Sequence, residues 1–402
     1  MTTKLCRIVP LMCVLQVFVA LSLSYGFNDE AHKLLSRGAV QPNVSILDNF
    51  LRTVLGFEFP NGINQTLSNG LTVEKHVEDG SVREDAGLRV RNHFHNPRLA
   101  WNQAGLGLPF TESSIVWAQN PSQLSFDKRS WQDARNYYFQ ALTATSDSER
   151  KRLYAETFRT LGHQIHHVQD AATPAHTRND WHLSLDWFGG GPDPDAFHYW
   201  GETLAGQAVI GASNPPPFDT SLLNQSGANP NAPIPIARIL DSTDGDIGTL
   251  ALTPGISMGL AEYSSANFFS NDTINSPNFL SPRSNHVEVR TEADLSIPPK
   301  QRPYVYFKAA VGDTSYPLAL ASAMLPYVID PLATPTENGL DDKVFQGYGT
   351  KLFPRAIGYS AGLIDYFFRG NIGSDVAHAG PFPVGSPPTE ITVTDMVNST
   401  PD

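Results

Sequence analysis

The sequence predicts an all-α domain built from many helices, with a loop-rich insertion and a short C-terminal tail. Several segments place apolar residues at helical spacing, and few alternate apolar and polar residues as strands do. The chain has 402 residues, 41% of them hydrophobic, which is enough to bury a large core. We expect the domain to occupy residues 27–370, the insertion about 213–250, and the tail 371–402.

The first 26 residues are typical of an export signal peptide. Lys4 and Arg7 give a positive start, residues 8–23 are apolar and uncharged, and small residues lie three and one positions before the expected cut. An uncleaved membrane anchor is the disfavoured alternative, because a span needs about 20 apolar residues. The mature chain would begin at Phe27, would be secreted or periplasmic, and would contain no cysteine for disulfides.

The clearest helix is predicted from Asp147 to about Thr173. Asp147 or Ser148 can cap its start, and Glu149 favours the first turn. The helix must end near Thr173, because Pro174 disfavours helical backbone in the residue before it. A rough apolar face is formed by Leu153, Phe158, Leu161 and Ile165.

Four further segments are predicted to be helical. One begins near Asp195 and continues to 211, and the others cover 255–270, 308–329 and 343–370. Residues 214–235 are rich in Pro, Asn, Gly and Ser, which indicates the loop-rich insertion. The tail is rich in Pro and Gly and contains one strand-like stretch at 390–397.

Residues 161–180 contain four histidines and two aspartates. Residues four apart on a helix share a face, so His166 and Asp170 can bind the same ion. His198 and Glu202 repeat this spacing on the next predicted helix, and His176 lies between the two pairs. One such pair is common without a metal, but two pairs with a histidine between them favour a metal site. Imidazole and carboxylate without thiolate suit Zn²⁺.

These motifs resemble the zinc-dependent phospholipase C and single-strand nuclease superfamily, whose members are largely helical and bind three zinc ions. The resemblance covers His-x-x-x-Asp, a Pro-x-His turn and His-x-x-x-Glu, in that order. Residues 79–97 resemble the family segment in which Asp85 and His93 are ligands. Family members also use the free amino group and carbonyl of the first mature residue, which here is Phe27 where the family usually has Trp.

The resemblance implies three zinc ions, with Asp170 bridging two of them. A hydroxide held between two ions would attack phosphorus in line, with Asp85 and Asp170 as the catalytic carboxylates. The implied ligand sets are Asp85, His93, His166 and Asp170 for the first ion, His176, His198 and Glu202 for the second, and Phe27, His32 and Asp170 for the third.

Two substrate classes fit this resemblance. The net charge of −12 and the segment at 92–97 favour a phospholipase C, whose phospholipid or other phosphodiester substrate would bring it to a membrane surface. The short gap between Phe27 and His32 is closer to the nuclease branch, and only that alternative implies nucleic acid. A non-catalytic zinc-binding exported protein is the third interpretation. No protein partner is implied.

Other residues near these motifs are given supporting roles. His95, His163 and His167 are expected to form the walls of the site or to support the ligands, or, for the last two, to face solvent. The tryptophans at 101, 117 and 200 could line a pocket for a choline or a base, but core packing is the default expectation for each.

Overall fold

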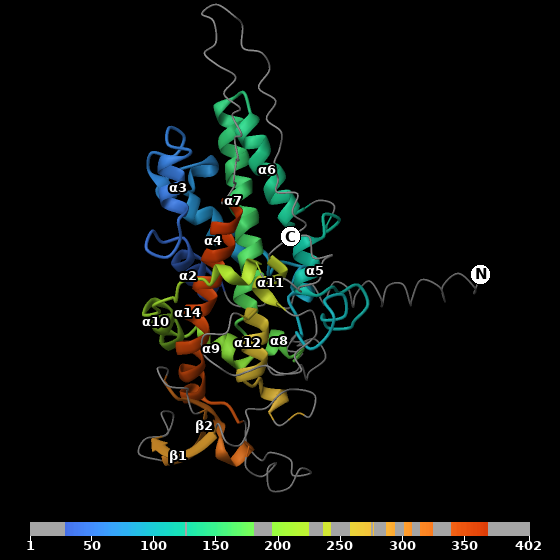
Figure 1. Cartoon of the computed structure of the whole chain (residues 1–402), viewed down its shortest axis with the longest axis vertical. Coiled ribbons are helices and arrows are strands. Elements are labelled where there is room, and N and C mark those ends of the chain that lie inside the picture. Colours follow the sequence, from blue (N-terminus) through green and yellow to red (C-terminus); the bar gives the residue numbers. More distant parts are fainter. Residues whose placement is uncertain are drawn as a thin grey trace, which may run out of the picture.

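A computed structural model gives the fold of residues 29–124, 127–180, 195–224, 236–242, 258–274, 276, 287–293, 301–307, 314–324 and 339–368. These residues are mostly helical, with one small three-stranded sheet (Figure 1). The predicted helical character is therefore confirmed. The expected signal peptide, the tail and the strand-like stretch at 390–397 lie outside the described residues.

The N-terminal half contains short helices followed by one long helix. Its α-helices are α2 (Asp29–Ala39), α3 (Leu47–Thr53), α4 (Val73–Arg83), α5 (Ser114–Gln119), α6 (Trp131–Thr143), α7 (Asp147–Asp170) and α8 (Pro174–Thr177). Its 3-10 turns are η2 (Gly62–Asn64), η3 (Ser68–Gly70) and η4 (Val90–Asn92).

The C-terminal half contains further short helices, the sheet and a second long helix. Its helical elements are α9 (Ala196–Gly201), α10 (Leu204–Gly211), η6 (Thr220–Asn224), α11 (Ile236–Leu240), α12 (Leu260–Asn267), η7 (Asn271–Thr273) and α14 (Asp342–Phe367). Its strands are β1 (Val287–Ala293), β2 (Gln301–Phe307) and β3 (Tyr316–Leu320). Within the predicted loop-rich insertion, the structure places the short helix α11.

Helix α7 begins at Asp147 as predicted, but its capping residue and its C-terminal end differ from the prediction. Ser146 caps it, because its side chain accepts from the backbone N–H of Glu149. The helix ends at Asp170, and Thr173 is extended before Pro174, which begins α8. The metal-capable residues at its C-terminal end therefore lie on a regular helix that stops at Asp170.

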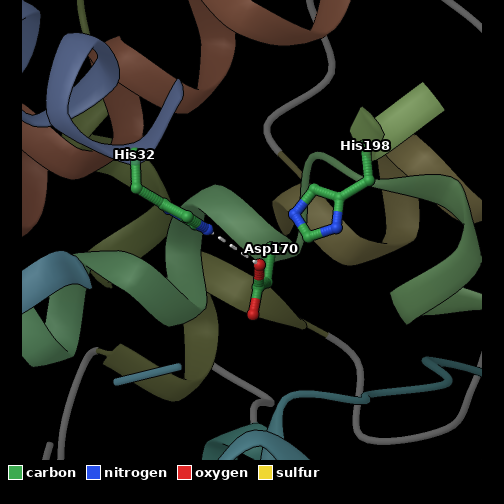
Figure 2. A group of neighbouring side chains, drawn as sticks. All are labelled: His32, Asp170 and His198. Atoms are coloured by element: carbon green, nitrogen blue, oxygen red, sulfur yellow. Dashed lines mark ion pairs between the residues drawn. The ribbon is translucent and has the colours of Figure 1, made fainter. Parts of the chain in front are cut away.

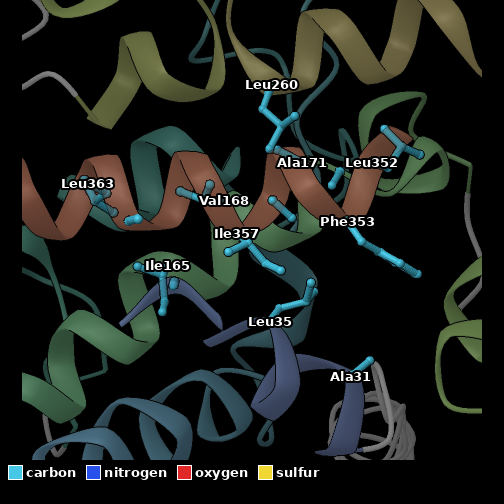
Figure 3. Packing of buried hydrophobic residues seen from close by; sticks show 14 of the residues in the cluster. Ala31, Leu35, Ile165, Val168, Ala171, Leu260, Leu352, Phe353, Ile357 and Leu363 are labelled. Atoms are coloured by element: carbon cyan, nitrogen blue, oxygen red, sulfur yellow. The ribbon is translucent and has the colours of Figure 1, made fainter. Parts of the chain in front are cut away.

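The core lies between α7, α14 and α2, with α12 packed on top (Figure 3). Ile165 and Val168 of α7 and Leu35 of α2 have at most 1% of their surface exposed. At 24 residues α7 is roughly 36 Å long, and it runs beside α14 through the middle of the molecule (Figure 1).

None of the described helices combines the length and the apolar character that crossing a membrane requires.

The sheet is antiparallel, in the order β1-β2-β3, and β3 packs on α14. The predicted helix at 308–329 is wrong over Tyr316–Leu320, which is β3, although residues 321–324 are helical. All five residues of β3 are buried. A short apolar run without alternation has no periodicity that separates a strand from a helix, which explains the error.

Two glycines bring α4 and α7 into direct backbone contact. A Cβ atom on Gly162 would lie 2.3 Å from the carbonyl oxygen of Val77 and 2.8 Å from the Cα of Gly80. A Cβ on Gly80 would come still closer to the carbonyl oxygen of Arg159, at 1.9 Å. This close approach places the end of α4, with Asp85 just beyond it, against the histidine face of α7.

We expect Gly162→Ala to destabilise the fold. Alanine favours a helix by about 1 kcal/mol over glycine, but overpacking a close contact typically costs about 1–3 kcal/mol, and here the contact is with rigid backbone. Urea unfolding should show a lower free energy of unfolding than in the unmodified protein. The control is Gly211→Ala at the end of α10, where an added Cβ meets nothing within 4 Å. Equal stability of the two variants would contradict this account of the helix contact.

Candidate metal centre

Four ligand atoms meet at the C-terminal end of α7. They are Asp85 Oδ1, His93 Nδ1, His166 Nε2 and Asp170 Oδ2, and five of their six separations lie between 3.0 and 3.6 Å. Tetrahedral ligands bound at about 2.0–2.1 Å from an ion lie about 3.3 Å apart. These five separations are therefore in the range expected for ligands of one metal ion.

The protonation state of His166 is also the one that a metal ligand needs. Its Nδ1–H donates to the carbonyl oxygen of Ser81 at 2.7 Å, so Nε2 carries the lone pair. Burial lowers the pKa of His166 to about 4, so the ring is neutral near pH 7. The Nε2 lone pair then faces a carboxylate oxygen of Asp170 at 3.0 Å. Two acceptors this close repel each other unless a positive ion lies between them.

A second set of ligand atoms lies on the other side of Asp170. His32, Asp170 and His198 each offer one ligand atom within 4.8 Å of the others, and they point toward a common centre (Figure 2). His32 Nε2 is 3.6 Å from Asp170 Oδ1. Its Nδ1 lies 2.5 Å from Gln169 Oε1, which accepts because the amide nitrogen of Gln169 donates to Ser36. Burial, followed by repulsion from His166, lowers the pKa of His32 to about 3, so its Nε2 is free of a proton near pH 7.

Two carboxylates face both sets of ligands. Asp170 directs Oδ2 toward His93 and His166, and Oδ1 toward His32 and His176. Asp85 directs Oδ1 toward the first set and Oδ2 toward His32, at 3.8 Å. The family resemblance implied a bridging role for Asp170 alone, but Asp85 also faces both sets of ligands. Shared carboxylates of this kind are what a pair of closely spaced ions requires.

Two of the residues predicted for the second zinc ion, His176 and His198, lie close together beside Asp170. His176 Nδ1 lies 3.2 Å from Asp170 Oδ1, and the rings of His176 and His198 are 5.2 Å apart. The carboxylate of Glu202 accepts from the first amides of α2, at 2.9 Å from Ala31 and 3.3 Å from Glu30. Glu202 thus holds the start of α2 next to α9, and its role as a ligand stays a prediction.

Phe27 lies outside the described residues, so its predicted role is open to a direct experiment. We expect protein with an extra Met before Phe27 to bind fewer zinc ions and to hydrolyse phosphodiesters far more slowly than correctly processed protein. The added residue moves the α-amine by about 3.5 Å, which an ion held by His32 and Asp170 could not follow. Zinc content and turnover are measured for both forms. If the two forms agree in both, Phe27 is not a ligand.

Residues expected to support the site lie close to it but outside the ligand sets. His95 Nε2 is 2.9 Å from Asp241 Oδ2, which also accepts from Trp101 Nε1 at 3.0 Å. The three tryptophans considered as pocket walls are each at most 7% exposed and pack in the interior. His163 and His167 are buried, so neither faces solvent.

The sequence did not indicate Glu84 as a site residue. Its side chain is fully buried, and its carboxylate contacts Arg89, His163 and Trp117. It directly precedes Asp85, and the two carboxylates face opposite nitrogens of the His93 ring, Asp85 at Nδ1 and Glu84 at Nε2. A pair of acidic residues at the end of a helix is a weak indication, because such pairs usually lie in solvent.

Comparisons with protein-family models, with curated proteins and with solved structures found no match for this chain.

Proposed function

We propose that this chain is a zinc-dependent phosphodiester hydrolase, and more specifically a phospholipase C that acts on phospholipid head groups. The spacing of the ligand atoms of Asp85, His93, His166 and Asp170 is the observation that carries the proposal. The sequence motifs that resemble the three-zinc superfamily support it. We also propose that the bound ions are three zinc ions. This number and this metal come from the resemblance, and the described clusters of ligands supply the residues that would hold them.

The residues of the centre have distinct parts in the proposed reaction. Bound zinc ions would supply Lewis acidity toward a phosphoryl oxygen and would lower the pKa of an attacking water. Ser81 and Gln169 hold His166 and His32 with the proton on Nδ1, so that both rings present Nε2 to the centre. Asp85, whose two oxygens face both sets of ligands, would accept the proton of the attacking water.

Exposed apolar side chains that follow His198 and Glu202 in the chain favour a lipid over a nucleic acid. Tyr199 on α9 is 63% exposed and directly follows His198, and Leu204 at the start of α10 is 86% exposed. Apolar groups of this kind suit contact with acyl chains at a membrane surface. The net charge of −12 disfavours binding to a polyanion.

The test is a comparison of two substrates with one preparation. Purified processed protein is assayed on phosphatidylcholine vesicles and on single-stranded DNA, with zinc and after chelation. We expect zinc-dependent release of the phosphorylated head group and little cleavage of DNA. Zinc-dependent cleavage of DNA alone would assign the nuclease function instead. Hydrolysis of neither substrate by zinc-loaded protein would favour the non-catalytic interpretation.

A further inference from the structure

A second group of buried polar side chains lies next to the metal centre, around Glu84. The Oε2 atom of Glu84 accepts from Arg89 Nε at 2.7 Å and lies 2.6 Å from His163 Nδ1. Its Oε1 atom accepts from Trp117 Nε1 at 2.8 Å. A carboxylate has about four acceptor positions, so one position on Oε1 remains.

Two imidazole nitrogens face that remaining position without the geometry of a hydrogen bond. His167 Nε2 is 3.4 Å from Glu84 Oε1, and His93 Nε2 is 3.9 Å from it. Neither of these nitrogens has a hydrogen-bond partner within the described parts of the chain, and both rings are at least 97% buried. A buried polar atom without a partner typically costs about 1–3 kcal/mol, so an arrangement with two of them calls for a bound group.

The spacing of these three atoms fits a metal ion better than a set of hydrogen bonds. Hydrogen bonds between N and O are about 2.7–3.2 Å long, whereas ligands of one tetrahedral zinc ion lie about 3.3 Å apart. Glu84, His93 and His167 each offer one ligand atom within 4.8 Å of the others. Arg89 binds the opposite oxygen of Glu84, so its guanidinium does not lie between the three ligand atoms.

The ring of His93 belongs to both groups. Its Nδ1 lies 3.1 Å from Asp170 in the first ligand set, and its Nε2 faces Glu84. We propose that Glu84, His93 and His167 form an additional zinc site, which shares the His93 ring with the centre around Asp170. His93 would then bind one ion through each ring nitrogen, as an imidazolate, and its second ring proton would be released to solvent when the ions bind.

Zinc binding by a matched pair of variants tests this site without any assay of substrate turnover. His167→Phe keeps a planar ring but cannot bind an ion, whereas His76→Phe changes a buried histidine of α4 that belongs to none of the described ligand groups. After equilibrium dialysis against zinc, His167→Phe should hold about one ion fewer than the unmodified protein, and His76→Phe should match it. Equal zinc content in all three proteins would overturn the additional site and leave the proposed function standing.

A map of the ions in the unmodified protein gives a second test that does not depend on the folding of a variant. Anomalous diffraction at the zinc absorption edge, from crystals of zinc-loaded protein, should show a peak between Glu84, His93 and His167, separate from the peaks around Asp170. If peaks appear around Asp170 but none appears beside Glu84, the additional site is overturned and the proposed function stands. Absence of any peak would overturn the proposed function as well.

Discussion

Asp170→Asn should abolish phosphodiester hydrolysis, with a loss of at least about a thousandfold in kcat/KM, and should reduce the zinc content. The Asp170 carboxylate faces His93 and His166 with one oxygen and His32 and His176 with the other. Asparagine keeps the shape but removes the charge that both ligand sets share. Metal ions supply several kcal/mol of transition-state stabilisation, and each 1.4 kcal/mol is about tenfold in rate.

The control for this change is His95→Ala. His95 is buried two residues from His93, but its Nε2 bonds Asp241 outside the ligand sets. Both turnover and zinc content should remain close to those of the unmodified protein, once the folded fraction has been checked by circular dichroism. Equal damage from the two changes would show that the ligands have been wrongly identified.

Removal of metal should lower the melting temperature by at least about 10 °C. Without ions, the carboxylate oxygens of Asp85 and Asp170 remain buried beside His93 and His166, whose pKa values burial lowers. Bound metal contributes directly to folding free energy, and about 1 kcal/mol shifts the melting temperature of a large domain by about 2–4 °C.

Calorimetry before and after chelation, and again after zinc is restored, measures this effect. Zinc should return the melting temperature to its first value. Chelation should lower the melting temperature of Asp170→Asn less than that of the unmodified protein. The reason is that this change already impairs both sets of ligands to which Asp170 belongs. A melting temperature that chelation leaves unchanged would contradict a buried metal centre that stabilises the fold.

Local patterns in the sequence were enough to predict the long helices. Pro174 and the polar residues near 147 delimit α7, and the start of α9 near Asp195 follows from the same capping chemistry. The sheet was not predicted. The alternating residues of β1 (Val287–Ala293) were a usable indication, but β3 is buried throughout and depends on pairing with β2. Tertiary contacts of that kind leave no local pattern.

The candidate site also depends partly on local sequence patterns and partly on tertiary contacts. Helical spacing alone places His166 and Asp170 on one face of α7. Asp85 and His93 are more than seventy residues earlier in the chain than His166, and reach it because Gly80 and Gly162 let α4 and α7 touch. Only the resemblance to a known family placed them in the site from sequence. Glu84 was missed because burial, rather than residue type, distinguishes it from a solvent-exposed acid.

Elemental analysis of zinc-loaded, thoroughly dialysed protein tests the central claim most directly. The claim is that Asp170 and Asp85 each lie between two sets of ligands, which requires more than one tightly bound ion per chain. We predict four zinc ions per processed chain, which are the three of the proposed centre and one in the additional site beside Glu84. A content of one ion or none in correctly processed protein would contradict a multi-zinc centre, and with it the proposed hydrolase.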